Sequence, residues 1–197
     1  MAFLRSVAGD VGPSIRGERI FLRQPHFGDF AQWSRLREES RAFLSPWEPT
    51  WPVDDLTRGA YRRRIRRYVQ DMRDDLAYPF YAFRNEDEGL VGGLTLSNVR
   101  RGVTQSCTLG YWAGERFARQ GYMSEAVSLV LPFVFGQLRL HRLEAACLPT
   151  NQPSIGLLEK VGFTREGYAR SYLRINGSWQ DHFLFAMLHD DPRPVLR

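Results

Sequence analysis

The sequence predicts a single α/β domain with helices on both faces of a mixed, mostly antiparallel central sheet of about seven strands. The chain has 197 residues, which is the length of one domain with a sizeable core. Its apolar periodicity runs in the order strand, two helices, three strands, helix, strand, helix and two strands. The pair Asn176-Gly177 is the strongest short signal for a hairpin, so the last two strands should be antiparallel neighbours.

The first part of the chain predicts one strand and two helices. Residues 18–23 alternate as a strand, and residues 26–40 carry apolar side chains at helical spacing. The segment 43–55, FLSPWEPTWPVDD, holds three prolines and two tryptophans and predicts a structured loop. Asp54 or Asp55 is expected to cap the helix that follows, which runs to about residue 75.

The second part predicts two helices between strands. The helix expected over residues 121–138 contains Pro132, which lacks an amide donor and should kink it. Residues 151–161 have helix signals at both ends, with Asn151 as N-cap and Gly162 just past the last turn. The strands of this part are predicted at residues 78–84, 90–99, 105–113, 143–148, 163–175 and 179–188. We expect an arm over residues 1–16, one domain over 17–190 and a tail over 191–197.

Composition excludes several classes of protein. No apolar run approaches the length of a membrane span, and the N-terminus lacks a secretion signal, so we expect a cytoplasmic protein without a membrane partner. Cys107 and Cys147 are the only cysteines and lack zinc-ligand spacing. They are therefore expected to be buried thiols, and we expect no metal. The net charge is +5, and Lys160 is the only lysine among the basic residues.

A strand-to-helix joint in the window LGYWAGERFARQGYMSEAV, residues 109–127, predicts an anion site. The first amides of a helix have no internal partner, and the helix dipole adds partial positive charge there. Gly121 lets the backbone approach a ligand closely, and Arg116 adds charge nearby. Many such joints bind nothing, so the plain structural interpretation stays open. The residues of the joint are Arg119, Gln120, Gly121, Tyr122, Met123 and Ser124.

A second window, residues 141–163, also ends a strand and opens a helix. Asn151 can cap that helix or bind an amide-bearing ligand. Glu144 lies mid-strand among apolar residues, where a carboxylate is costly unless it is paired. It should therefore face a cleft or an arginine, and a carboxylate in a cleft is a candidate general base.

Three blocks of the sequence resemble the GNAT superfamily of acetyltransferases, specifically the RimJ/RimL-type ribosomal-protein alanine N-acetyltransferases. The blocks are GYWAGERFARQGYMSEA, HRLEAACLPTNQPSIGLLEKVGF and GYARSYLRINGSWQDHFLFAML. The resemblance extends over residues 17–188. It implies the GNAT fold and an enzyme that moves an acetyl group from acetyl-coenzyme A to an amine, with no metal.

The resemblance also implies roles for individual residues. The diphosphate of coenzyme A would lie on the joint at Gly121, although Ala118 and Met123 depart from the general signature. The pantetheine arm would lie along the strand at Tyr111, Trp112 and Ala113, and Asn151 would contact it. Ser154 would protonate the leaving thiolate, because the tyrosine that does so in other members is replaced by Leu158.

The amine would attack the thioester directly in a ternary complex, and a strand amide would stabilise the oxyanion. Glu144 is the first candidate base, and Glu166 or no protein base are the alternatives. The N-terminal alanine of a ribosomal protein is the expected acceptor, and the alternative is a small amine such as an amino sugar, polyamine or amino acid. Trp47, Trp51 and Tyr78 are candidates for the acceptor side, although each could instead be a core anchor.

The run RRRIRRY predicts a basic helix that could dock on ribosomal RNA or could simply be solvated. Its arginines are Arg62, Arg63, Arg64, Arg66 and Arg67. A third hypothesis is a non-catalytic nucleic-acid-binding protein that keeps the fold. The sequence leaves monomer and homodimer both open.

Overall fold

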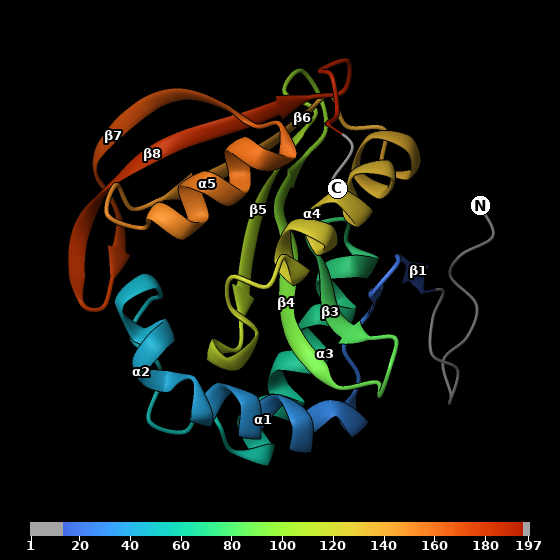
Figure 1. Ribbon diagram of the computed structural model, residues 1–197, viewed down its shortest axis with the longest axis vertical. Helices are drawn as coiled ribbons and strands as arrows, with labels where there is room; N and C mark the ends of the chain where they lie inside the picture. The colour runs from blue at the N-terminus through green and yellow to red at the C-terminus, as the bar shows by residue number, and fades with distance from the viewer. Residues whose placement is uncertain (1–13, 195–197) are drawn as a thin grey trace.

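A computed structural model describes residues 14–194 and shows one eight-stranded sheet through the whole domain (Figure 1). The strand order is β1-β2-β3-β4-β5-β6-β8-β7, and every neighbouring pair is antiparallel except β5 and β6. The predicted mixed, mostly antiparallel sheet is therefore confirmed. The strands are β1 (Ile15–Arg16), β2 (Ile20–Arg23), β3 (Tyr78–Arg84), β4 (Leu90–Arg100), β5 (Ser106–Ala113), β6 (Arg142–Cys147), β7 (Thr164–Ile175) and β8 (Ser178–Leu188).

The strand that the sequence did not predict is β1, which pairs with β2. β1 lies at the end of the segment that was expected to be an arm. The arm predicted over residues 1–16 thus overlaps the sheet at its last two residues. Residues 1–13 and 195–197 lie outside the described part of the chain, so most of that arm and the end of the predicted tail do as well.

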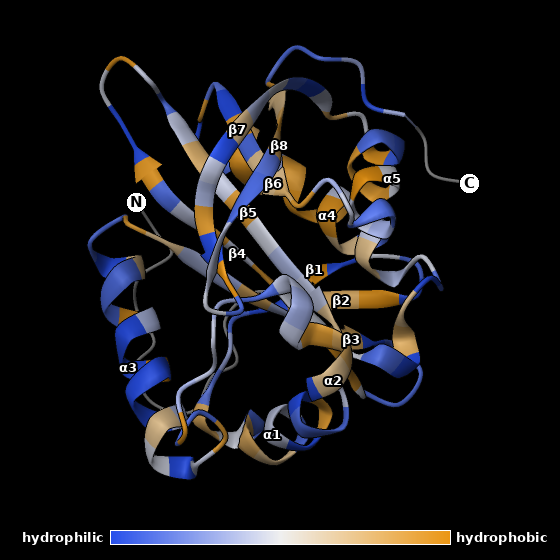
Figure 2. Cartoon of the chain, turned by 90° about the vertical axis from the view of Figure 1, so that its left-hand side faces the viewer, coloured by the Kyte–Doolittle hydropathy of each residue, from blue (hydrophilic) through white to orange (hydrophobic). Residues whose placement is uncertain are grey.

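The helices cover both faces of the sheet, as predicted (Figures 1 and 2). Adjacent residues of β3 show the division, since Phe80 packs edge-on against Phe133 beyond α4, whereas Tyr81 faces Tyr61 of α3. One face thus carries α4 and α5, and the other carries α1 and α3. The helices are α1 (Phe30–Glu39), α2 (Arg41–Leu44), α3 (Arg58–Arg73), α4 (Tyr122–Pro132) and α5 (Gln152–Val161).

The cap predicted for α3 was wrong. Thr57 caps this helix through a hydrogen bond from the Ala60 N–H to its side-chain oxygen. Asp54 and Asp55 lie further upstream and instead form ion pairs with arginines of α3. The loop predicted over residues 43–55 is also partly helical, because α2 ends inside it and a 3-10 turn (Ser45–Trp47) follows.

The helix predicted over residues 121–138 changes form at its proline. The regular α4 ends at Pro132, and a π-helical turn (Phe133–Gln137) continues from it. The Leu138 N–H donates to the Phe133 carbonyl, five residues back. The missing amide of Pro132 thus ends the α-helical bonding rather than only bending it.

The core extends over both faces of the sheet, and one part of it lies under α4 and α5, where apolar strand and helix residues face each other (Figure 2). Val127 and Val130 of α4 and Leu143 of β6 are fully buried there. Cys107 and Cys147 are buried free thiols, as predicted. This packing holds α4 and α5 against the strands that form the site described below.

Candidate active site

The sheet splits between its two parallel strands. Pairing of β5 with β6 ends at Leu109 and Ala145. Beyond this point β5 follows β4 up to Ala113, while β6 follows β8 up to Cys147 and turns away with it (Figure 1). The edge of residues 110–113 that faces β6 is therefore left without a strand partner.

The backbone at the end of β5 offers a donor to this opening. The Gly114 N–H donates to the Val91 carbonyl of the neighbouring strand at 2.9 Å. Because successive peptide groups of a strand point in opposite directions, the N–H and C=O of Ala113 point away from β4 and toward the gap. An amide in this place can stabilise negative charge that develops on a carbonyl oxygen.

The turn between β5 and α4 has the geometry of an anion site. Arg119 and Gly121 both have positive φ, at 59° and 82°, and flank Gln120. Backbone of this kind, placed before a helix, gathers N–H groups into an anion-binding concavity. The first helical bond runs from Glu125 N–H to the Gly121 carbonyl, and in the described structure the three preceding amides have no acceptor. These amides belong to Tyr122, Met123 and Ser124.

Free positive charge lies beside these amides. Arg116 and Arg119 are exposed, and neither forms an ion pair with any residue that the structure describes. Met123 and Ser124 are buried, so their side chains support the turn while their amides open to the ligand side. The residues present therefore fit a diphosphate group.

Arg19 holds the turn in place, and sequence reasoning missed this residue. Its Nη1 donates to the Gln120 carbonyl at 3.0 Å, and its guanidinium lies 4.5 Å from the centre of the Tyr122 ring. Glu125 in the first turn of α4 accepts from the Arg19 backbone and side chain. No local pattern marks Arg19, because its partners lie about 100 residues further along the chain.

On the α5 side of the opening, two hydroxyls meet. The Tyr111 hydroxyl lies 2.7 Å from Ser154 Oγ. Burial raises the pKa of Tyr111 above its ordinary range, so the phenol stays protonated at neutral pH. Asn151 caps α5 by accepting from the Ser154 N–H at 3.2 Å, which confirms its predicted capping role and fixes the position of Ser154.

Glu144 is paired with an arginine, one of the two arrangements foreseen from the sequence. Arg142 Nε donates to Glu144 Oε1 at 2.8 Å, and the same guanidinium pairs with Glu166. That pairing holds the pKa of the Glu166 carboxyl below its ordinary value. Glu144 lies in register with Thr108, in the paired part of β5 and β6 just before the opening.

Open space separates Glu144 from the tip of β5. Thr108, Gly110 and Trp112 alternate onto the same face as Glu144. A side chain added at Gly110 would meet no atom within 4 Å. An acceptor can therefore lie over Gly110, with Glu144 on one side and Trp112 on the other.

An ion pair connects the predicted tryptophan loop to α1, beside Trp112 at the end of β5. Arg37 of α1 donates from both terminal nitrogens to Glu48, each at 2.7 Å, and Trp51 Nε1 donates to the same carboxylate at 2.7 Å. The Arg37 guanidinium lies 3.9 Å from the Trp51 ring centre and 5.0 Å from that of Trp112. Arg37 and Glu48 were missed by sequence reasoning, because their contact depends on how α1 meets the loop.

The three predicted acceptor residues are not all brought together. The Arg37 guanidinium lies over the rings of both Trp51 and Trp112, so Trp51 is close to the same face of the sheet as Trp112. Trp47 is the last residue of the 3-10 turn, directly before Glu48. The Tyr78 ring packs against Phe133 on the opposite face of the sheet. Its hydroxyl donates to Asp75 at 2.8 Å, so the structure gives Tyr78 the contacts of a packing residue.

Two further properties concern metals and membranes. Residues 14–194 contain no group of three or more His, Cys, Asp or Glu side chains arranged to hold a metal ion. Within the same range, no helix combines the length and apolarity that crossing a membrane requires.

The fold and this site define a class of protein. Residues 19–164 match the family model described as Acetyltransferase (GNAT) domain. The chain belongs to this family, and it is an acetyl-coenzyme A-dependent acetyltransferase with the GNAT fold.

Three individual proteins are similar to this chain over most of its length. The chain is 35% identical over 177 residues to the Probable N-acetyltransferase YjcK of Bacillus subtilis, covering 90% of this chain and 98% of the relative. It is 32% identical to the [Ribosomal protein uS5]-alanine N-acetyltransferase of Escherichia coli, covering 92% and 95% of the two chains. Among solved structures, Mycobacterium smegmatis RimJ in complex with CoA-disulfide superposes with a TM-score of 0.82 and 32% identity, covering 90% and 86%.

Proposed function

We propose that this enzyme acetylates the N-terminal alanine of a ribosomal protein in the cytoplasm. The observation that carries the proposal is the composition of the acceptor face, where Arg37 and Trp51 lie beside Trp112 and the space over Gly110 is open. The carboxylates beside this space, Glu48 and Glu144, are already paired with Arg37 and Arg142. A polycationic amine would find no free negative charge in the cluster, whereas a peptide with a single amine needs none. The similarity to the Escherichia coli enzyme supports the same acceptor class.

We assign the coenzyme diphosphate to the bare amides of Tyr122, Met123 and Ser124, with Arg116 and Arg119 adding charge. The pantetheine arm then follows the free edge of β5 from the turn toward Ala113, where strand amides can bond its amides. Asn151 stays a predicted contact to this arm. The Mycobacterium smegmatis relative is in complex with CoA-disulfide, which supports coenzyme A as the ligand of this enzyme.

The groups around the opening suit direct transfer of the acetyl group. The amine attacks the thioester carbon, the Ala113 N–H stabilises the oxyanion, and the bond to the coenzyme sulfur then breaks. Ser154 donates a proton to the departing thiolate and draws one from Tyr111, whose hydroxyl lies 2.7 Å away. Bulk solvent then restores the Tyr111 proton.

The amine needs little help to become neutral. An N-terminal α-amine has a pKa of about 8, so roughly a tenth is unprotonated near pH 7. Glu144, which also accepts a hydrogen bond from Arg142, can accept the proton through a water over Gly110. Glu166 is a weaker candidate, because Arg142 lowers the pKa of its carboxyl.

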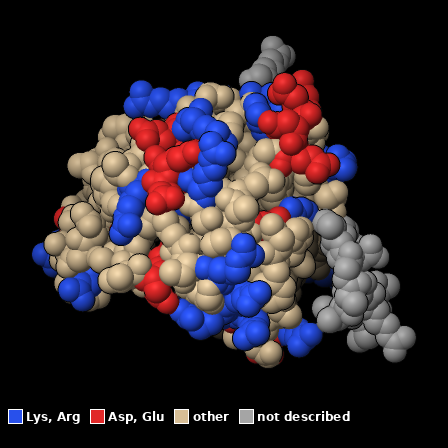
Figure 3. Space-filling model, turned by 90° about the horizontal axis from the view of Figure 1, so that it is seen from below, with Lys and Arg blue, Asp and Glu red and all other residues tan. Residues whose placement is uncertain are grey.

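A docking role on ribosomal RNA is the second part of the proposal. Basic side chains gather on the end of the molecule that carries α1 and α3 (Figure 3). Of the predicted set, Arg63 and Arg64 are neutralised by Asp54 and Asp55. The exposed arginines Arg62, Arg66 and Arg67 make no ion pair within residues 14–194 and remain available for phosphates.

An acceptor screen tests the catalytic proposal. The purified protein is mixed with acetyl-coenzyme A and short peptides that begin with alanine, serine or acetyl-alanine, and with spermidine and glucosamine, and free thiol is followed. We expect turnover with the alanine peptides and none with the acetylated one. Turnover with spermidine or glucosamine but with no peptide would show that the acceptor is a small amine and not a protein N-terminus.

A further inference from the structure

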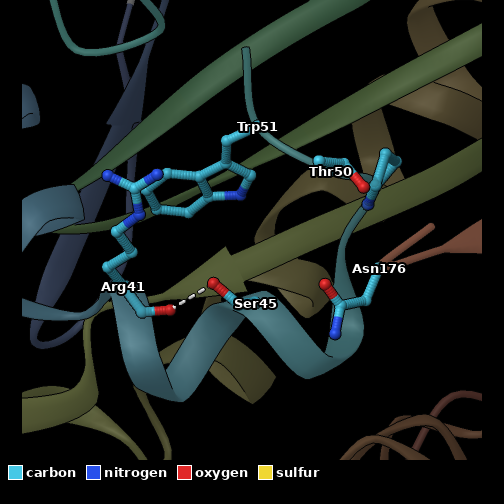
Figure 4. Close-up of a pocket in the computed structure, with 6 residues that line it drawn as sticks. Arg41, Ser45, Thr50, Trp51 and Asn176 are labelled. Atoms are coloured by element: carbon cyan, nitrogen blue, oxygen red, sulfur yellow. Dashed lines mark hydrogen bonds between the residues drawn. The ribbon is translucent and has the colours of Figure 1, made fainter. Parts of the chain in front are cut away.

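A second pocket lies on the acceptor side, between the tryptophan loop and the turn that joins β7 to β8 (Figure 4). Its volume is about 130 Å³, enough for several atoms of a ligand, since a water molecule occupies about 30 Å³. Its walls come from segments that lie far apart in the sequence. The lining residues are Arg41, Ser45, Pro49, Thr50, Trp51 and Asn176.

The pocket carries one positive charge and no negative one. Arg41 is exposed at the start of α2, and its guanidinium lies beside the Trp51 indole, 5.5 Å from the ring centre. The neighbouring arginines of α1 are neutralised, since Arg35 pairs with Glu39 and Arg37 with Glu48. Arg41 pairs with no carboxylate in the described structure.

The other polar groups of the lining complement this charge. Thr50 adds a hydroxyl and Asn176 a side-chain amide. The Ser45 hydroxyl donates its hydrogen bond to the Arg41 carbonyl at 2.7 Å. A guanidinium with further donors and no carboxylate is the chemistry that recognises an anionic oxygen pair.

The pocket is built on fixed supports. The Asn176 N–H donates to the Glu48 carbonyl at 2.9 Å, which ties the β7–β8 turn to the loop. The Glu48 carboxylate also holds Arg37 and Trp51. The walls are therefore positioned before any ligand arrives, which lowers the cost of binding.

The pocket lies within reach of the reacting end of β5. The centre of the Trp51 ring lies 5.5 Å from the Arg41 guanidinium and 3.9 Å from the Arg37 guanidinium. The Arg37 guanidinium in turn lies 5.0 Å from the centre of the Trp112 ring. Taken end to end, these contacts keep Arg41 within about 14 Å of the Trp112 ring, a span that about four extended residues cover.

We propose that this pocket binds a side-chain carboxylate of the second, third or fourth residue of the acceptor peptide. The inference rests on the proposed function, because it places the acceptor's amine at the tip of β5. The acceptor is then an N-terminal alanine followed closely by aspartate or glutamate.

The test compares peptides that differ in one charge. Four-residue peptide amides of alanine carry Asp, Asn or Lys at position 2, 3 or 4, and free alanine and tetra-alanine with a free carboxylate are included. Acetylation of each is followed by thiol release and by mass. At one or more positions, we expect the Asp peptide to have a kcat/KM about tenfold above its Asn partner, through a lower KM.

Two variants assign the effect to the pocket. Arg41→Ala should abolish the difference in kcat/KM between the Asp and Asn peptides. Arg41→Glu should favour the Lys peptide instead. Arg35→Ala is the matched control, since it removes a neighbouring exposed guanidinium outside the pocket and should keep the preference for Asp.

The outcomes separate this inference from the proposed function. If alanine peptides are acetylated equally with Asp, Asn or Lys, or if Arg41→Ala keeps the preference, the pocket proposal is wrong while the function stands. If tetra-alanine with a free carboxylate gains as much as the Asp peptides and free alanine does not, the pocket binds a terminal carboxylate, which also overturns the side-chain proposal. If no peptide reacts while coenzyme A still binds, the proposed acceptor class itself fails.

Discussion

The Tyr111 hydroxyl lies 2.7 Å from the Ser154 hydroxyl, across the opening between β5 and α5. One residue comes from the strand that would carry the coenzyme arm, and the other from the first turn of the helix capped by Asn151. The sequence predicted Ser154 as the proton donor and Tyr111 only as a contact to the coenzyme arm. Under the proposed mechanism, this contact would make a two-step proton path from the partly buried Tyr111 phenol to the leaving thiolate.

Removing either hydroxyl should slow the chemical step. We expect Ser154→Ala and Tyr111→Phe each to lower kcat by about 100-fold or more, with KM for acetyl-coenzyme A little changed, because general acid catalysis typically contributes about 10²- to 10⁴-fold. The double variant should lose little more than the worse single one, since both act in one path. Tyr168→Phe is the control, because that phenol bonds Asp181 on the outer strands. Additive losses would contradict a shared path.

Gly121 should matter for coenzyme binding through its backbone. Gly121→Ala forces a side chain onto a residue at φ 82°, and a Cβ there would lie 3.1 Å from Arg19 Nη2. We expect the Kd for coenzyme A, measured by calorimetry, to rise about tenfold through distortion of the amides. Gly102→Ala is matched, since Gly102 also has positive φ but meets nothing within 4 Å. An equal rise in both variants would show that strain alone is responsible.

The buried ion pair of the acceptor face should be sensitive to loss of one partner. Glu48→Gln leaves the Arg37 guanidinium, 8% exposed, without its counter-charge. The expected loss of unfolding free energy is about 3 kcal/mol, measured by urea denaturation. Glu39→Gln breaks the exposed pair with Arg35 on the same helix and should leave the midpoint nearly unchanged. A small effect for Glu48→Gln would mean that water reaches Arg37.

Because its two thiols are buried, we expect the protein to lose unfolding free energy at alkaline pH. Burial raises the pKa of Cys107 to about 12 and that of Cys147 to about 11, against an ordinary value of 9.0. Between pH 9 and 11 the unfolded chain releases these protons and the folded chain keeps them, so folding loses free energy as pH rises. From pH 8 to 10 the loss is roughly 1 kcal/mol per thiol.

The measurement is the urea midpoint of the protein and of the Cys107→Val/Cys147→Ala variant at pH 8 and pH 10. The variant starts from a lower midpoint but should decline less between the two pH values. An identical decline would assign the alkaline loss to other groups, such as the buried tyrosines.

The basic surface of α3 predicts a salt-dependent affinity for RNA. Changing Arg62, Arg66 and Arg67 to alanine should weaken binding to a ribosomal RNA fragment and lower the slope of log K against log salt by about 0.9 per lost contact. Changing Arg63 and Arg64 should do less, because aspartates already neutralise them. Equal effects of the two sets would indicate that the surface acts only through net charge.

Local pattern determined much of this protein. The order of the elements, the Asn151 cap and the hairpin at Asn176-Gly177 follow from periodicity and from turn residues, which act over a few positions. The turn at Gly121 could be located because it needs only bare amides and a glycine before a helix. The eighth strand was missed because β1 has two residues, too few to show a period.

Packing decided the rest. The contacts of Tyr111 with Ser154, Arg37 with Glu48 and Arg19 with Gln120 join residues 43, 11 and 101 positions apart. The place of Glu144 before the split depends on which strands separate, and that of Tyr78 on which face of the sheet meets Phe133. Such contacts depend on how strands and helices meet in space, and periodicity describes only which side of one element is apolar.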